Sequence, residues 1–120
     1  MSIVMMLGRI FVGWLFVFIG IRNFLTWDKN LSHLKSFHWL PVPAIVLGVG
    51  VSLEILCGLA VIFGYWVQLA ASYLIVFTVV VTYFFHNFWS TEGEERMHHL
   101  IAATVNLAVI GGLLLAMRMS

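Results

Sequence analysis

Apolar residues run along this chain in four long blocks, separated by short polar stretches. The blocks cover residues 3–25, 41–64, 66–85 and 100–117. A helix needs about 20 mostly apolar residues to cross a hydrocarbon core of about 30 Å. Backbone groups in lipid must be hydrogen-bonded within their own segment, so each block is expected to be helical, including the β-branched run VFTVVVTYFF. The pattern predicts an all-α fold, a four-helix transmembrane bundle.

The connections between the blocks differ in length. Only GYW joins the second block to the third, which predicts a tight helical hairpin with Gly64 at the C-cap. The first connection, residues 26–42, contains WDKNLSHLKSFHWL. Its larger apolar residues can share one helical face, which predicts a short interfacial helix between spans one and two. These residues are Leu31, Leu34, Phe37 and Trp39. Tryptophans near the span ends match an aromatic belt: Trp27, Trp39, Trp66 and Trp89.

The composition agrees with a membrane protein. Hydrophobic residues make up 62% of the 120 residues and charged residues 9%, against about 45–50% and about 25% in soluble domains. This length fits a single domain over residues 1–120, with the lipid bilayer as its main partner. The net charge of +1 indicates no nucleic-acid partner. A lone cysteine, Cys57, excludes an intrachain disulfide or a CxxC pair.

Two features bear on how the chain sits in the membrane. The first block is long and begins without positive charge, so it is expected to be a retained span rather than a cleaved signal. An even number of spans places both termini on one side. The basic residues of the first and third connections favour those connections inside and the termini outside. They are Lys29, Lys35 and Arg96, with Arg22 at the edge.

Glu54 is an acidic residue halfway through the second block, near the expected midplane of the bilayer. Ionisable residues inside spans usually face the bundle interior. Gly50 and Gly58, one turn before and after Glu54, would let another helix approach that face closely. Arg9 in the first block is the expected partner in an ion pair. Two roles stay open for this pair: fixing the register of the helices, or binding a ligand or handling protons.

Each of the other spans also carries polar or small residues near one stripe, which predicts a polar seam or small cavity opening towards the first and third connections. Arg22 is expected to extend towards the surface. The candidates for ligand binding or proton handling are Arg9, Glu54, His86 and Asn106. The supporting residues are Gly20, Arg22, Gly50, Gly58, Thr78, Thr82 and Trp89.

Histidines gather around the third connection, at His86, His98 and His99. Neither HExxH nor a paired CxxC is present, so no metal site is predicted. Haem would need two histidines facing each other across helices at similar depth. His86 with His98 or His99 could do so, but their sequence spacing favours ordinary interface residues and disfavours haem.

Three stretches in order, LGRIFVGWLFVFIGIRNF, VSLEILCGLAVIFG and YFFHNFW, resemble the DoxX family over about residues 7–117. The resemblance implies a small four-helix protein of the prokaryotic cytoplasmic (inner) membrane. The family takes its name from the small subunit of an archaeal thiosulfate:quinone oxidoreductase, and other members are associated with redox stress. By resemblance, residues at recurring family positions are Arg9, Gly20, Glu54, Gly58, His86 and Trp89, with Arg22 where lysine is common.

This resemblance implies an accessory membrane subunit of a redox system that holds a quinone or another small lipophilic molecule in the polar seam. A redox partner protein would dock at the first and third connections. Arg9, His86 and Asn106 would supply donors to the quinone carbonyls, and Glu54 would accept or relay a proton. Thiol-handling relatives use cysteine pairs, which this chain lacks, so autonomous thiol–disulfide chemistry is not expected.

Two other functions remain open at this point. The chain could be a ligand-free membrane scaffold that binds other proteins. It could also be a small proton-coupled transporter acting as a homo-oligomer, because four helices are few for alternating access. A cavity beside Glu54 would favour the ligand-holding function, and a fully packed interior there would favour the scaffold.

Overall fold

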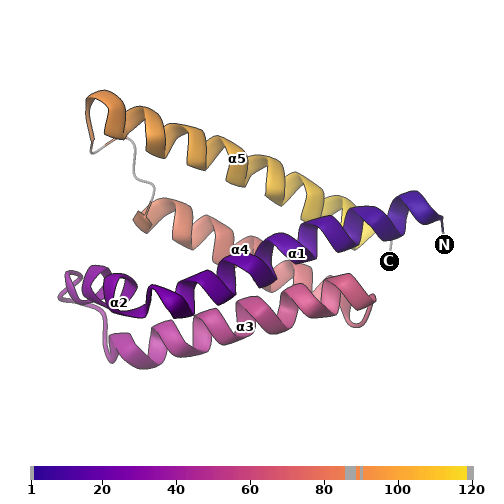
Figure 1. Ribbon diagram of the computed structural model, residues 1–120, viewed down its shortest axis with the longest axis horizontal. Helices are drawn as coiled ribbons and strands as arrows, with labels where there is room; N and C mark the ends of the chain where they lie inside the picture. Colours follow the sequence, from indigo (N-terminus) through magenta and orange to yellow (C-terminus); the bar gives the residue numbers. More distant parts are fainter. Residues whose placement is uncertain (1, 86–88, 90, 119–120) are drawn as a thin grey trace.

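The chain is described by a computed structural model at residues 2–85, 89 and 91–118. In this part of the chain the α-helices are α1 (Ile3–Leu25), α2 (Trp27–Lys35), α3 (Pro43–Phe63), α4 (Val67–Phe85) and α5 (Gly93–Arg118) (Figure 1). All but α2 are long and apolar enough to cross a membrane. The predicted class, a four-helix transmembrane bundle with a short extra helix between spans one and two, is therefore confirmed.

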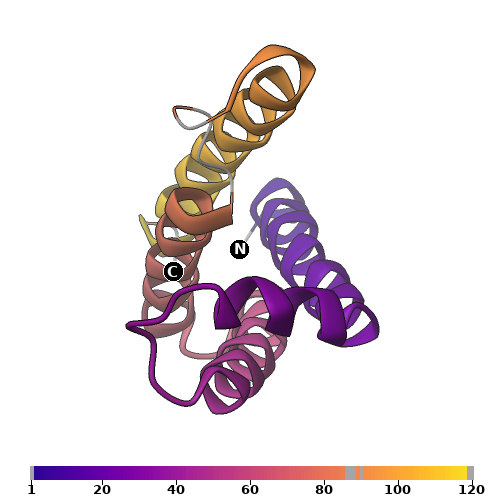
Figure 2. The same cartoon turned by 90° about the vertical axis from the view of Figure 1, so that its left-hand side faces the viewer.

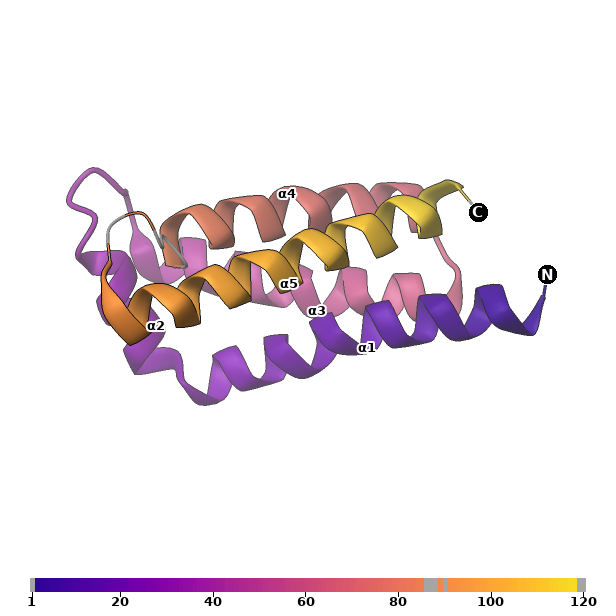
Figure 3. The same cartoon turned by 90° about the horizontal axis from the view of Figure 1, so that it is seen from above.

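The four long helices run roughly along one axis, and the N- and C-termini lie at the same end (Figures 1 and 3). We call this the termini end. The opposite end, which we call the loop end, contains α2 with residues 36–42 and the beginning of α5. Four consecutive crossings bring the chain back to the side where it began, as the even number of apolar blocks required.

The closest helix pair is α1 with α3, whose backbones touch at two glycines. A Cβ atom at Gly13 would lie 2.5 Å from the carbonyl oxygen of Gly58, and one at Gly58 would lie 2.9 Å from that of Gly13. Any side chain at either position would push the helices apart. Gly58 is thus a close-approach glycine, as predicted. Gly50 faces α4 instead, where its Cβ would make an ordinary contact of 3.7 Å with Phe77.

The apolar core lies towards the termini end of the bundle. It joins the middle of α1, the second half of α3, the first half of α4 and the end of α5, through Phe16, Val61, Ala70, Ala71, Leu74 and Leu113. The buried residues of α5 are Leu113 and Ala116, both near its C-terminus. The first half of α5 diverges from α1 and α3 towards the loop end (Figures 1 and 2). Packing therefore holds the bundle together mainly at one end.

The hairpin between α3 and α4 turns at Gly64. Its φ of 80° lies in the left-handed region that favours glycine, and the N–H groups of Gly64 and Tyr65 both donate to the Ala60 carbonyl at 2.9 Å. The predicted glycine C-cap is confirmed. Further along the hairpin, the Tyr73 hydroxyl on α4 donates to the Gly50 carbonyl on α3 at 3.0 Å.

Replacing Tyr73 with phenylalanine should lower the free energy of unfolding by about 0.5–1.5 kcal/mol, the usual net value of one hydrogen bond. The ring and its packing remain, while the bond from α4 to the Gly50 carbonyl is lost. Thermal unfolding in a mild detergent measures the change. Tyr83→Phe is the matched control, because the structure records no hydrogen bond from the Tyr83 hydroxyl to a described residue. An equal loss in both variants would contradict the assignment.

The predicted short helix between spans one and two is present as α2, but it ends at Lys35, so Phe37 and Trp39 lie beyond it and do not share its face. The helix is tied to the end of α1. The side-chain amide of Asn30 donates to the Asn23 carbonyl and to the Thr26 hydroxyl, both at 3.2 Å. The Trp27 ring lies 3.6 Å from the position of a Cβ on Gly48 of α3. These contacts place α2 across the loop end, beside both α1 and α3.

The fourth long helix begins about two turns before the predicted span, which starts near residue 100. The helix begins at Gly93, because Glu94 and Glu95 in its first turn interact favourably with the positive end of the helix dipole. Its polar first turns extend the helix beyond the apolar block. The tryptophans near the span ends are found where the belt predicted them: Trp27 begins α2, Trp39 follows it, Trp66 precedes α4, and Trp89 follows α4.

Candidate functional site

Glu54 is buried near the middle of α3, at the contact with α1, and 2% of its surface is exposed. The side-chain N–H of Asn23 donates to Glu54 Oε1 at 3.2 Å. A Cβ at Gly20 would lie 3.5 Å from the same oxygen. The carboxyl group therefore lies in ordinary van der Waals contact with α1 at Gly20, whose missing side chain makes room for Ile55, and an amide one turn further along α1 binds the carboxyl oxygen.

The predicted ion pair between Arg9 and Glu54 is wrong. Arg9 is buried at the termini end, where its Nη1 lies 2.6 Å from the position of a Cβ on Gly64. Gly64 follows Glu54 by ten residues, which corresponds to about 15 Å along a helix. Glu54 faces Gly20 and Asn23 instead, so the two charged groups are too far apart to pair.

The register of two antiparallel helices explains this correction. Gly13 lies against Gly58, so moving towards the loop end along α1 means moving backwards along α3. Seven residues after Gly13, Gly20 meets Ile55 and Glu54. The sequence reasoning missed Asn23 as a site residue, although it lies on the same stripe of α1. Aligning the glycines of the two helices would have found it.

A second polar contact joins α4 and α5. The Asn106 side-chain N–H donates to Thr82 Oγ1 at 2.9 Å, and the Thr82 hydroxyl donates to the Thr78 carbonyl at 2.7 Å. The single hydroxyl hydrogen of Thr82 is used in the bond to Thr78, so Thr82 can only accept a hydrogen bond from Asn106. The NH₂ group of the Asn106 amide must therefore face Thr82. The Thr78 hydroxyl is buried and donates to the Leu74 carbonyl at 2.7 Å.

A groove of about 240 Å³ runs beside this contact, between α4 and α5. Its rim is more than half exposed at Val79, Tyr83 and Leu107, within helices that can cross a membrane, so the groove opens towards lipid. The Trp89 ring lies beside the Tyr83 ring in a tilted arrangement, with centroids 5.4 Å apart. The residues that line the groove are Val79, Thr82, Tyr83, Trp89, Ala103, Asn106, Leu107 and Ile110.

The candidate residues do not converge on one site. Arg9 lies at the termini end, Glu54 lies between α1 and α3, and Asn106 lies between α4 and α5. Arg22 is exposed in the last turn of α1. His86 lies outside the described residues. The expected continuous polar seam is therefore divided into two separate polar contacts, one between α1 and α3 and one between α4 and α5.

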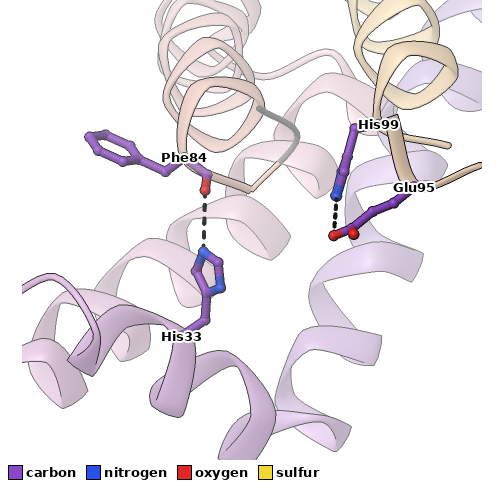
Figure 4. Close-up of polar contacts among 4 residues, drawn as sticks. All are labelled: His33, Phe84, Glu95 and His99. Atoms are coloured by element: carbon purple, nitrogen blue, oxygen red, sulfur yellow. Dashed lines mark hydrogen bonds and ion pairs between the residues drawn. The ribbon is translucent and has the colours of Figure 1, made fainter. Parts of the chain in front are cut away.

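Two histidines at the loop end, His33 and His99, make polar contacts with neighbouring residues (Figure 4). His33 Nε2 donates to the Phe84 carbonyl at 3.2 Å, and its ring stacks on Phe85 with centroids 4.3 Å apart. This contact, which the sequence analysis did not identify, ties α2 to the end of α4. His99 Nε2 lies 3.7 Å from Glu95 on the same helix. In the described part of the chain, no group of three His, Cys, Asp or Glu residues is placed to hold a metal ion.

Comparison with protein families matches the chain to the DoxX family model over residues 4–87. The matched region includes Arg9, Gly20, Glu54, Gly58 and the threonines of α4. Searches of curated proteins and of solved structures gave no match. The family match covers more than two thirds of the 120 residues and agrees with the four apolar helices. The chain is an integral, multi-pass membrane protein that belongs to the DoxX family.

Proposed function

We propose that this protein is an accessory membrane subunit of a redox system, and that it holds the ring of a quinone in the groove between α4 and α5. The observation that carries the proposal is the groove itself, which combines apolar walls with one amide, that of Asn106. Ligand sites are typically apolar concavities with a few placed polar groups. The function would be to present the quinone to a partner protein.

The size of the groove suits one substituted ring. An apolar cavity of about 150 Å³ holds benzene, so about 240 Å³ leaves room for a ring with short substituents. A quinone's long isoprenoid tail would not fit. Because the groove opens through exposed residues of membrane helices, the tail would lie among the lipid acyl chains.

The polar groups of Asn106 suit the chemistry of a quinone. One side-chain N–H of Asn106 donates to Thr82, and within the described residues the amide makes no other hydrogen bond. The second N–H is therefore available to a quinone carbonyl, and the amide oxygen to a quinol hydroxyl. The rings of Tyr83 and Trp89 in the lining offer faces for stacking.

Partner docking at the loop end is supported by its charged, exposed surface. Lys29 and Lys35 are exposed on α2, while Glu94, Glu95 and Arg96 are exposed at the start of α5. The basic residues favour this end in the cytoplasm of a prokaryotic cell. A redox partner with its own charged surface would meet the protein there.

The test is binding of decylubiquinone, a short-tailed quinone, to the purified protein in lipid nanodiscs. Asn106→Leu should weaken binding about tenfold, because it removes a hydrogen bond worth about 1.4 kcal/mol. Ala103→Phe should abolish binding by filling the groove while Asn106 stays. Asn23→Leu is the control, since it removes an amide from the other polar contact. Unchanged binding in Ala103→Phe would reject the groove as the site.

A ligand-free scaffold is the second candidate, supported by the packing around Glu54. Glu54 is 2% exposed and its carboxyl group packs against Gly20, and Glu54 is not among the residues that line the groove between α4 and α5. Mass spectrometry of the intact protein released gently from its own membrane separates the two functions. A co-purified quinone supports the proposal. Protein partners without any quinone support the scaffold.

A further inference from the structure

The Glu54 carboxyl group has surroundings that do little to stabilise a negative charge. Among residues 2–85, 89 and 91–118, it makes one hydrogen bond, from Asn23 to Oε1 at 3.2 Å, and no ion pair. Its other oxygen, Oε2, accepts no hydrogen bond from this part of the chain. An ionised carboxylate offers about four acceptor sites, so a single neutral donor leaves most of them unsatisfied.

The charged and titratable groups on the neighbouring helices do not supply the missing hydrogen bonds or a positive charge to Glu54. On α1, Arg9 lies beside Gly64 and Arg22 is exposed. On α4, the Tyr73 hydroxyl donates its proton to the Gly50 carbonyl. Cys57, the titratable residue near Glu54 on α3 itself, is half-buried and carries no positive charge. The α5 sequence has no ionisable residue between His99 and Arg118.

A neutral carboxylic acid fits this environment better than an anion does. Buried charges are normally paired, and a group without a partner takes up or loses a proton instead. In the neutral form, Oε1 is the carbonyl oxygen that accepts from Asn23, and Oε2 carries the proton. Glu54 lies near the middle of a helix that can cross the membrane, where an unpaired charge is especially costly.

We propose that Glu54 is a proton-binding site inside the membrane and that Asn23 positions its carboxyl group by bonding to Oε1. The proton is bound and released at Oε2. Gly20 lies beside the acid on α1, 3.5 Å from Oε1 to the position of its Cβ. The site lies between α1 and α3 and is separate from the groove between α4 and α5, so the proposal does not depend on a quinone.

Infrared spectroscopy of the full-length protein in lipid bilayers tests this directly. At about pH 8, carboxylates in water are ionised, so the exposed acids of the loop end give no carboxylic acid band. The wild type should show the carbonyl band of one protonated acid, and Glu54→Gln should lose it. If Glu54→Gln instead loses a carboxylate band, the acid is ionised and the proposal is overturned.

The role of Asn23 has its own readout. A carbonyl that loses a hydrogen bond vibrates at higher frequency, so Asn23→Leu should shift the Glu54 acid band upwards. Asn106→Leu, the same change in the other polar contact, should leave it in place. An unshifted band in Asn23→Leu would remove the positioning role.

A further measurement uses the wild type alone, so its result does not depend on whether a variant folds. Transfer of the wild type into D₂O should lower the frequency of the acid band, because the O–H at Oε2 becomes O–D. This shift shows that the proton exchanges with water. A band that stays fixed in D₂O would mean that the proton is not released, which would overturn the proposed binding site.

Discussion

Replacing Gly13 with leucine should destabilise the protein by about 1–3 kcal/mol or more, the usual cost of overpacking a close contact. A Cβ at this position would lie 2.5 Å from the Gly58 carbonyl oxygen and 2.6 Å from the Ile62 side chain. The carbonyl belongs to the backbone and cannot rotate away, so α1 and α3 would have to separate. Thermal unfolding in detergent should show a clear fall in Tm.

Gly8→Leu is the matched control, on the same helix and with the same added side chain. Nothing lies within 4 Å of a Cβ at Gly8, and this residue is exposed. Its Tm should stay the same or rise slightly, because leucine has a higher helix propensity than glycine. Equal losses in the two variants would mean that the contact between Gly13 and Gly58 does not determine how α1 and α3 pack.

Glu54→Lys should be the most damaging single change at the polar contact between α1 and α3. A lysine at the centre of a membrane helix costs about 2.5–3.5 kcal/mol on insertion scales. Asn23 donates its N–H towards this position, so the lysine ammonium group would face a hydrogen-bond donor instead of an acceptor. The yield of inserted protein and its Tm in detergent should both fall sharply.

Glu54→Gln separates the effect of charge from that of shape. Glutamine keeps the size of the side chain and a carbonyl oxygen that can accept from Asn23, so the fold should be retained with a loss of less than about 1.5 kcal/mol. A large loss in Glu54→Gln would show that the carboxyl group itself holds the bundle together. Such a result would favour a purely structural role for Glu54.

The polar chemistry of the interior was only partly predictable. The position of Glu54 within an apolar block predicted a buried acid facing another helix, and this is confirmed by its contact with α1. The choice of Arg9 as partner was wrong, because charge and approximate depth do not determine helix register. Gly13 and Gly58 set that register through backbone contact, and Gly20 accommodates the Ile55 side chain.

The sequence by itself determined the class of this protein and the limits of most of its helices. Long apolar blocks must become helices in lipid because their backbone groups have no other hydrogen-bonding partners. Gly64 and the short GYW connection likewise required a tight hairpin. These features depend on local chemistry and on the membrane as solvent, so they can be predicted without knowing which helices touch.

The tertiary structure alone decided which polar groups meet. It paired Glu54 with Asn23, placed Arg9 near Gly64, and joined Asn106 to Thr82 beside a groove of about 240 Å³. It also made α5 diverge at the loop end (Figure 1). The physical reason is that contacts between helices depend on their rotation and relative shift. Close packing of small residues decides both the rotation and the shift. The sequence of one helix alone specifies neither quantity.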